Sequence, residues 1–208
     1  MEQGSEEWDE VRLGKMTASP AAIWLVNGRG DTVTHNDKEL KLGAGVKAYL
    51  YGKAGELIAG KELDGYSGGA MERGHDFERM ARGEYEDKTF NKVEQMGFVG
   101  LNDYVGFSPD GLVGDEGGIE IKCLLAKAHM FVIDNPTVFD KGFWAQIQFS
   151  LAISGREWWD LVHFNPSFKK NRLIIRRILP DPATIERFLL CASYYEQEIK
   201  RLVKLDEI

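Results

Sequence analysis

Residues 108–123, SPDGLVGDEGGIEIKC, combine two turn sequences with a strand and organise the centre of the chain. SPDG and DEGG are typical of turns, and the last five residues alternate strictly between apolar and polar side chains. Successive side chains of a strand point to opposite faces, so Glu120 and Lys122 share one face. The hairpin can fold Asp110 back beside Glu120. The stretch therefore predicts two carboxylates and one ammonium group within a few ångströms of one another.

The rest of the chain predicts helices packed around strands. Helices are predicted over 46–60, 71–89, 141–154 and from 182 onward, strands over 93–101, 104–108, 158–164 and 171–179, a mobile Gly-rich loop over 27–45 and a loop over 60–69. This order predicts an α/β (α+β) fold, a single domain over residues 1–208 with a central mixed β-sheet flanked by helices.

Composition sets limits on the class of protein. The 208 residues carry 26 Lys+Arg against 33 Asp+Glu, a net charge of −7, with 43% hydrophobic residues. This balance excludes general disorder and argues against coating nucleic acid through bulk charge, although a local basic site is compatible with it. No apolar run is long enough to predict a membrane span. Two cysteines, Cys123 and Cys191, and an acidic start are what we expect of a protein in a reducing cytoplasm. We expect both cysteines to be buried and inert.

The Asp110, Glu120 and Lys122 set suggests metal-assisted phosphodiester hydrolysis. Mg²⁺ is a hard ion that takes oxygen ligands, which the two carboxylates and the carbonyl of Ile121 could supply. Lys122 could orient a water molecule and steady the charge that grows on a phosphate. The alternative is an ordinary turn followed by a solvated strand face.

Two further side chains could join this site. Glu78 lies in the acidic helix and could add a third carboxylate, or it could only form charge pairs on a surface helix. Gln146 lies in a mostly apolar helix, where its amide needs a hydrogen-bond partner. It is either a core amide or a contact to water or DNA.

A candidate anion pocket lies near the N-terminus. Ser19 followed by Pro20 predicts the start of a short helix, whose free N–H groups favour anions. Arg12, Lys15 and the hydroxyls of Thr17 and Ser19 could hold a phosphate there. The alternative is an ordinary capped helix. A second basic stretch, 169–177, could bind a DNA backbone or could guard an exposed hairpin edge.

Six segments resemble one known family. They are WDEVRLGKMTAS (8–19), MERGHDFE (71–78), SPDGL (108–112), GIEIKC (118–123), WAQIQFSLAISG (144–155) and WWDLVHFNP (158–166). In this order the chain resembles the phage-lambda-type alkaline exonucleases, also called YqaJ-type viral recombinases, of the PD-(D/E)xK nuclease superfamily with its restriction-endonuclease-like core.

The resemblance implies a Mg²⁺-dependent exonuclease that degrades the 5′-ended strand of linear double-stranded DNA. It implies the release of 5′-mononucleotides and a 3′ overhang that serves recombination. Its implied site residues are the metal ligands Asp110 and Glu120, Glu78 as support for the metal site, Lys122 to activate the attacking water, the active-site glutamine Gln146, and the 5′-phosphate contacts Arg12, Ser19 and Ser108. It also implies two Mg²⁺ ions, with Mn²⁺ as a substitute, a homotrimeric ring, a single-strand annealing protein as partner, and a phage or prophage protein in a bacterial host.

The chain departs from the family pattern in places. Leu124 follows Cys123 where the family often has Pro, and residues 124–141 and 27–45 match poorly. Two other functions stay open at this point. One is an endonuclease on the same core, which would nick circular DNA. The other is a catalytically silent DNA-binding module, which would digest no DNA.

Overall fold

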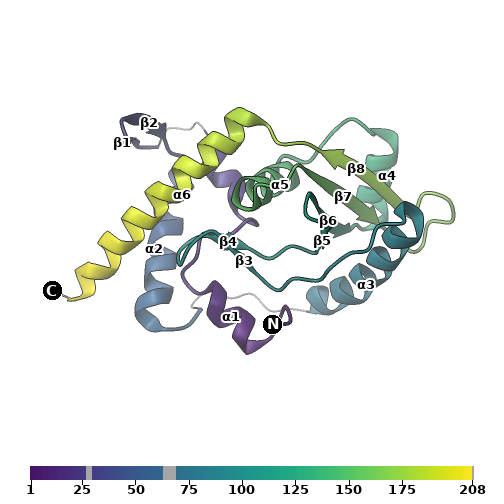
Figure 1. Ribbon diagram of the computed structural model, residues 1–208, viewed down its shortest axis with the longest axis horizontal. Helices are drawn as coiled ribbons and strands as arrows, with labels where there is room; N and C mark the ends of the chain where they lie inside the picture. The colour runs from purple at the N-terminus through teal and green to yellow at the C-terminus, as the bar shows by residue number, and fades with distance from the viewer. Residues whose placement is uncertain (27–29, 63–68, 208) are drawn as a thin grey trace.

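The computed structural model describes residues 1–26, 30–62 and 69–207, apart from the side chains of 69–75 (Figure 1). The elements in chain order are α1 (Glu6–Arg12), the 3₁₀ helix η1 (Ala21–Leu25), β1 (Thr32–His35), β2 (Lys38–Lys41), α2 (Ala44–Ala59), α3 (Gly69–Thr89), β3 (Val99–Gly100), β4 (Gly106–Phe107), β5 (Gly111–Val113), β6 (Gly117–Cys123), α4 (Ala126–Asp134), α5 (Lys141–Ser154), β7 (Trp158–Phe164), β8 (Leu173–Ile178), α6 (Pro182–Val203) and η2 (Lys204–Glu207).

The central sheet has four strands in the order β5-β6-β7-β8. β6 and β7 are parallel, with Glu120 opposite Leu161, whereas the β5–β6 and β7–β8 pairs are antiparallel. The crossover between the parallel pair contains the helices α4 and α5, since parallel strands need a long connection. The predicted α/β fold with a mixed sheet is confirmed.

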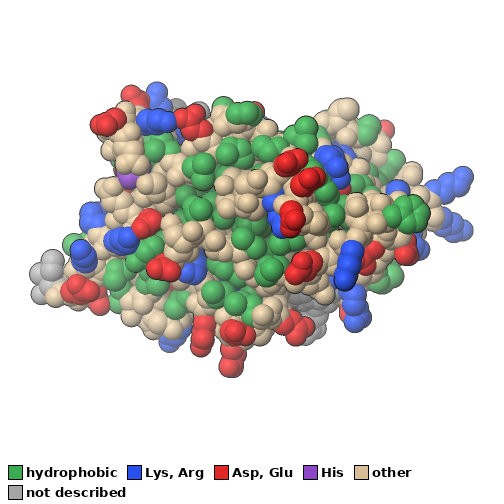
Figure 2. Space-filling model, viewed as in Figure 1, with side chains coloured by type: hydrophobic (Ala, Val, Ile, Leu, Met, Phe, Trp, Pro, Cys, Tyr) green, Lys and Arg blue, Asp and Glu red, His purple; other side chains and the backbone are tan. Residues whose placement is uncertain are grey.

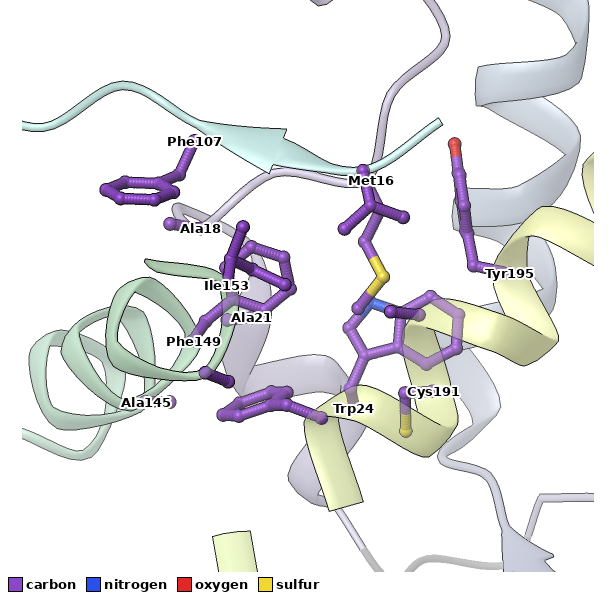
Figure 3. Close-up of a cluster of buried hydrophobic side chains, with 14 of the residues drawn as sticks. Met16, Ala18, Ala21, Trp24, Phe107, Ala145, Phe149, Ile153, Cys191 and Tyr195 are labelled. Carbon is purple, nitrogen blue, oxygen red and sulfur yellow. The ribbon is translucent and has the colours of Figure 1, made fainter. Parts of the chain in front are cut away.

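The sheet carries a helix layer on each face. Ile119 and Ile121 of β6 pack with Ala81 and Tyr85 of α3 in one hydrophobic cluster. On the other face, Trp159 belongs to a larger cluster that includes residues of η1, α2, α5 and α6, part of which is drawn in Figure 3. Since the side chains of β6 alternate, Glu120 and Lys122 point toward α5 rather than toward α3.

Local signals place the helix that covers this second face. Asp140 is the N-cap of α5, and its carboxylate accepts hydrogen bonds from the backbone N–H groups of Gly142 and Phe143. Gly155 ends the helix in the left-handed conformation with φ +66°, which glycine adopts without steric cost. The predicted bounds 141–154 are therefore confirmed, and Gln146 is held at a defined position over β6.

The prediction of a mobile loop over 27–45 is wrong for the described residues 30–45. Residues 32–41 form the β1–β2 hairpin, whose turn residues Asn36 and Asp37 have φ values of +50° and +59°, and α2 begins at Ala44. Asn and Asp tolerate this conformation, and it suits a tight hairpin turn. The hairpin is anchored on α6 by a hydrogen bond of 2.9 Å between His35 Nε2 and Ser193 Oγ.

Two other loop and strand predictions need comment. The predicted strand over 93–101 is wrong for most of its length, because only an isolated bridge at Glu94 and the two-residue β3 form within it. The predicted loop over 60–69 lies largely outside the described residues. None of the helices in the described part of the chain has the length and apolar composition that a membrane crossing needs.

Candidate active site

The candidate active site is built on β6, where one strand face carries charge beneath a helix. Glu120 is only 3% exposed, and its Oε1 lies 2.7 Å from Lys122 Nζ. Gln146 of α5 donates its Nε2 hydrogen to the same carboxylate at 2.7 Å and accepts a hydrogen bond from Lys122 at 3.2 Å. The three side chains therefore form a closed hydrogen-bonded set. Gln146 is a contact of this set and not an isolated core amide.

Asp110 joins the set through the β5–β6 pairing. β5 begins at Gly111, directly opposite Ile119 of β6, so the residue before β5 reaches the middle of β6. The Asp110 carboxylate accepts a hydrogen bond of 2.6 Å from the backbone N–H of Ile121. The structure therefore brings Asp110 beside the Glu120–Lys122 face, as the turn and strand sequences predict.

Glu78 approaches from α3, on the opposite layer. Its Oε1 lies 2.9 Å from Nη2 of Arg82, one helical turn later, and Arg82 also donates to the Asp110 carbonyl oxygen at 3.2 Å. Glu78 lines a cavity of about 290 Å³ together with Lys122, and a second cavity of about 450 Å³ together with Asp110. The position of Glu78 between two hollows leaves it open to a ligand from either side.

Burial of several carboxylates together disfavours their ionised forms. Burial, followed by repulsion from Asp110, raises the pKa of Glu120 to about 7. Burial, followed by repulsion from Glu78, raises the pKa of Asp110 to about 7, and burial also raises the pKa of Glu78. Burial alone would lower the pKa of Lys122, but the neighbouring carboxylates raise it, so the ammonium group stays charged. A positive charge placed among these carboxylates would offset the repulsion.

The donors of this cluster suit a hard divalent cation. Three carboxylates and the peptide carbonyl of Ile121 are oxygen ligands of the kind that Mg²⁺ prefers. Among the described side chains, however, no three carboxylate, histidine or cysteine groups already converge as a metal-binding group. Glu78 pairs with Arg82 and Glu120 pairs with Lys122 instead. The chemistry of the donors fits, and binding an ion would require these two ion pairs to rearrange.

A second group of polar side chains joins the N-terminal helix to the segment before β5. The guanidinium of Arg12 stacks on the ring of Trp8 at 4.0 Å and donates to Ser108 Oγ at 3.1 Å. Trp8 Nε1 donates to the same hydroxyl at 2.9 Å. Ser108 is two residues from Asp110, so this possible phosphate site adjoins the carboxylate cluster.

The predicted helix N-terminus at Ser19 is wrong. The helix is the 3₁₀ helix η1, its N-cap is Pro20, and no side chain caps it. Hydrogen bonds from Ala21 N–H to the Ala18 carbonyl and from Ile23 N–H to the Pro20 carbonyl close the tighter turns. Ser19 is exposed and Thr17 is buried. Of the predicted phosphate contacts, the structure joins only Arg12 and Ser108 by a hydrogen bond.

The basic stretch 169–177 does not form one patch. Arg172 pairs with Glu84, and Arg177 pairs with Asp160 at 2.9 Å. Arg176 donates hydrogen bonds to the backbone carbonyls of Pro136 and Val138, which lie between α4 and α5. Figure 2 shows Lys and Arg side chains projecting at the right edge, where Figure 1 places the β7–β8 loop that holds Lys169 and Lys170.

Both cysteines were expected to be buried and inert. Cys191 is fully buried, but Cys123 is half-buried and lines the cavity of about 290 Å³ beside Lys122. Burial and then repulsion from Glu78 raise the pKa of the Cys123 thiol to about 11, so it stays protonated. The expectation that Cys123 is buried is therefore wrong. A protonated thiol is nevertheless a weak nucleophile.

Sheet, helices and cluster together define a mixed α/β protein with a buried carboxylate–lysine cluster on its central sheet. The YqaJ-like viral recombinase domain model matches residues 7–157, so the chain belongs to the YqaJ-like viral recombinase family. The match spans α1, the carboxylate cluster and α5. No curated protein matched significantly.

Solved structures show the same fold over almost the whole chain. The crystal structure of an alkaline exonuclease (LHK-Exo) from Laribacter hongkongensis is 27% identical with a TM-score of 0.80, and the match covers 98% of this chain and 96% of that one. LHK-Exo in complex with dAMP is 28% identical with a TM-score of 0.80, over 97% and 95% of the two chains. A phage related exonuclease from Haemophilus somnus 129PT, 14% identical with a TM-score of 0.63 over 91% and 95%, shares the fold. Family and likeness together imply a nuclease.

Two residues that position the site, Arg82 and Trp8, and one buried carboxylate, Asp160, were not assigned a role from the sequence. Arg82 holds Glu78 and the Asp110 carbonyl, and its spacing of four residues from Glu78 was the available signal. Trp8 supports both Arg12 and Ser108. Asp160 is a buried residue of β7 and accepts a hydrogen bond of 2.7 Å from the hydroxyl of Tyr85 on α3, which no local pattern indicates.

Proposed function

We propose that this protein is a Mg²⁺-dependent exonuclease that degrades the 5′-ended strand of linear double-stranded DNA. It would release 5′-mononucleotides and leave 3′ single-stranded overhangs for recombination. The observation that carries this proposal is the closed set of Glu120, Lys122 and Gln146 beside Asp110. Buried charge of this kind contributes nothing to a hydrophobic core and is typical of a catalytic site.

Asp110, Glu120, Glu78 and the Ile121 carbonyl would hold the Mg²⁺ ions, two by family resemblance, with Mn²⁺ as a substitute. When bound, the metal supplies Lewis-acid activation of water and stabilises charge on the phosphate. The ammonium group of Lys122 has three N–H donors, of which one contacts Glu120 and one contacts Gln146. The third N–H would hold and orient the attacking water. Gln146 fixes the direction of the Lys122 side chain.

The Arg12–Ser108 pair supports the 5′ polarity. A guanidinium and a hydroxyl can grip a terminal phosphate, and the stacking on Trp8 keeps the guanidinium in place. Burial lowers the pKa of Arg12 from its ordinary value, yet the group remains a cation at neutral pH. Ser19 is retained as a phosphate contact only on the family resemblance.

Assembly and setting are further parts of the proposal. The family resemblance supports a homotrimeric ring that encloses DNA, a single-strand annealing protein as partner, and action as a phage or prophage protein in the bacterial cytoplasm. An enzyme that captures one DNA end needs basic side chains only where the end enters, so an overall charge of −7 is compatible with this function. Gel filtration or native mass measurement tests the ring.

Strand-specific digestion tests the activity. The substrate is a linear duplex with one 5′-phosphate and a label on each strand, incubated with and without Mg²⁺. We expect loss of the 5′-phosphorylated strand only with Mg²⁺, and no cleavage by Lys122→Ala, which should still bind the duplex. Nicking of closed circular duplex DNA would instead indicate an endonuclease. Full activity of Lys122→Ala would refute the role of the lysine.

A further inference from the structure

An apolar groove of about 850 Å³ lies between α4 and the start of α5. Most of its wall is hydrophobic. The apolar wall residues include Leu124, Leu125, Phe131, Val138, Phe139 and Phe143. Leu125 is 84% exposed and Phe131 is 55% exposed. Large apolar side chains that stay open to solvent around one hollow mark a binding surface more often than isolated exposed residues do.

The groove adjoins the catalytic cluster. Leu124 and Phe143 line both the groove and the cavity of about 290 Å³ that contains Glu78 and Lys122. The ammonium of Lys122 lies 4.8 Å from the centre of the Phe143 ring. A polymer whose backbone lies against Lys122 could therefore place its neighbouring unit in the groove.

The charges around the groove favour an anionic polymer. Lys127, Lys141 and Arg176 line it against a single carboxylate, Asp140. Within the part of the chain that the structure describes, none of the three cations forms an ion pair. Asp140 is engaged as the N-cap of α5. An apolar wall with a positive rim is complementary to a molecule with flat apolar groups on a chain of phosphates.

We propose that this groove binds the bases of an unpaired DNA strand next to the scissile phosphate, with Phe131 as a stacking platform. This inference rests on the proposed function, since it extends the same site. Bases in a duplex are paired and stacked inside the helix, so only an unpaired strand can offer them to a protein groove. A groove for a protein segment would not require three cations without carboxylate partners around its rim.

The test compares Phe131→Ala with Phe90→Ala. Phe90 is 94% exposed and does not line the groove, so it is a matched Phe→Ala control. The probe is a fluorescein-labelled oligo-dT strand, measured by fluorescence anisotropy in EDTA, and KM and kcat are measured on linear duplex DNA with Mg²⁺. Thermal unfolding checks both variants, and Phe131 is exposed enough for its variant to fold. Lys127→Ala is measured in the same way over a range of salt concentrations.

We expect Phe131→Ala to weaken oligo-dT binding by at least about fivefold, the effect of losing one base–aromatic stack. KM should rise with kcat near that of the wild type, and Phe90→Ala should change neither. Lys127→Ala should reduce the dependence of binding on salt. Unchanged oligo-dT affinity in Phe131→Ala would overturn the inference, and so would an effect of the variant on oligomeric state alone, which would indicate a protein–protein contact.

The two proposals can fail separately. If wild-type protein digests no linear DNA, the exonuclease proposal is wrong, but weaker oligo-dT binding by Phe131→Ala still supports the groove. If the wild type digests DNA and Phe131→Ala binds and cleaves as the wild type does, only the groove proposal is wrong.

Discussion

Replacing Glu120 with Gln is expected to stabilise the metal-free protein while abolishing its response to Mg²⁺. Glu120 is 3% exposed and lies beside Asp110 and Lys122. Burial, followed by repulsion from Asp110, raises the pKa of Glu120 to about 7. Gln has nearly the same shape without the charge. Its carbonyl oxygen can still accept the hydrogen bond that Gln146 donates at 2.7 Å. The variant therefore removes buried repulsion and keeps the packing.

The magnitude follows from the pKa of Glu120. Each unit of pKa is worth about 1.4 kcal/mol, so the rise from 4.5 to about 7 corresponds to roughly 3 kcal/mol of lost stability once the group is ionised. The attraction of Lys122 is already contained in this net rise, and relaxation around the buried charge reduces the cost, so we expect a gain of about 1–3 kcal/mol at about pH 8.

The pH dependence has a definite sign. The folded state holds the Glu120 proton more tightly than the unfolded state. The stability that the Glu120 carboxyl contributes is therefore fully present below its ordinary pKa and is lost as pH rises through about 7. The advantage of Glu120→Gln should shrink toward zero as pH falls to the ordinary carboxyl range.

Urea unfolding in EDTA at several pH values, repeated with Mg²⁺, measures both effects. Mg²⁺ should stabilise the wild type by mass action and leave Glu120→Gln unchanged. Glu116→Gln, at an exposed position in the β5–β6 turn, is the control and should behave as the wild type. The reasoning fails if Glu120→Gln is less stable than the wild type in EDTA at high pH, or if Mg²⁺ stabilises both equally.

Three further substitutions test other parts of the structure. Arg12→Ala should erase the preference for 5′-phosphorylated ends, measured by competition between phosphorylated and unphosphorylated duplexes; original relative rates would exclude the phosphate role. Tyr85→Phe removes the hydrogen bond of 2.7 Å to buried Asp160 and should lower the free energy of unfolding in urea by about 1–3 kcal/mol. An unchanged free energy of unfolding would show that water replaces the hydroxyl. Gly118→Ala would place a Cβ 2.4 Å from the Trp159 ring and should cost about 1–3 kcal/mol, whereas a wild-type melting temperature would show that the ring can move aside.

Elements with strong local signals were predictable from the sequence. The bounds of α5 follow from an apolar helical pattern ended by Gly155, and α6 begins after Asp181 because an Asp N-cap and a following Pro favour a helix start. The β1–β2 hairpin was missed because its strands are short and mostly exposed, which gives little hydrophobic pattern. Ser19 failed as an N-cap because a 3₁₀ helix formed instead.

The sequence by itself determined which charged residues share a strand face and which turn residue lies near them. The two-residue period of a strand puts Glu120 and Lys122 on one side of β6, and a turn places Asp110 within reach. Only the tertiary structure decided that this face is covered by α5, so that Gln146 binds both charged groups instead of water. Local rules act over a few residues, whereas the contact between a strand and a helix depends on the order and direction of strands in the whole sheet.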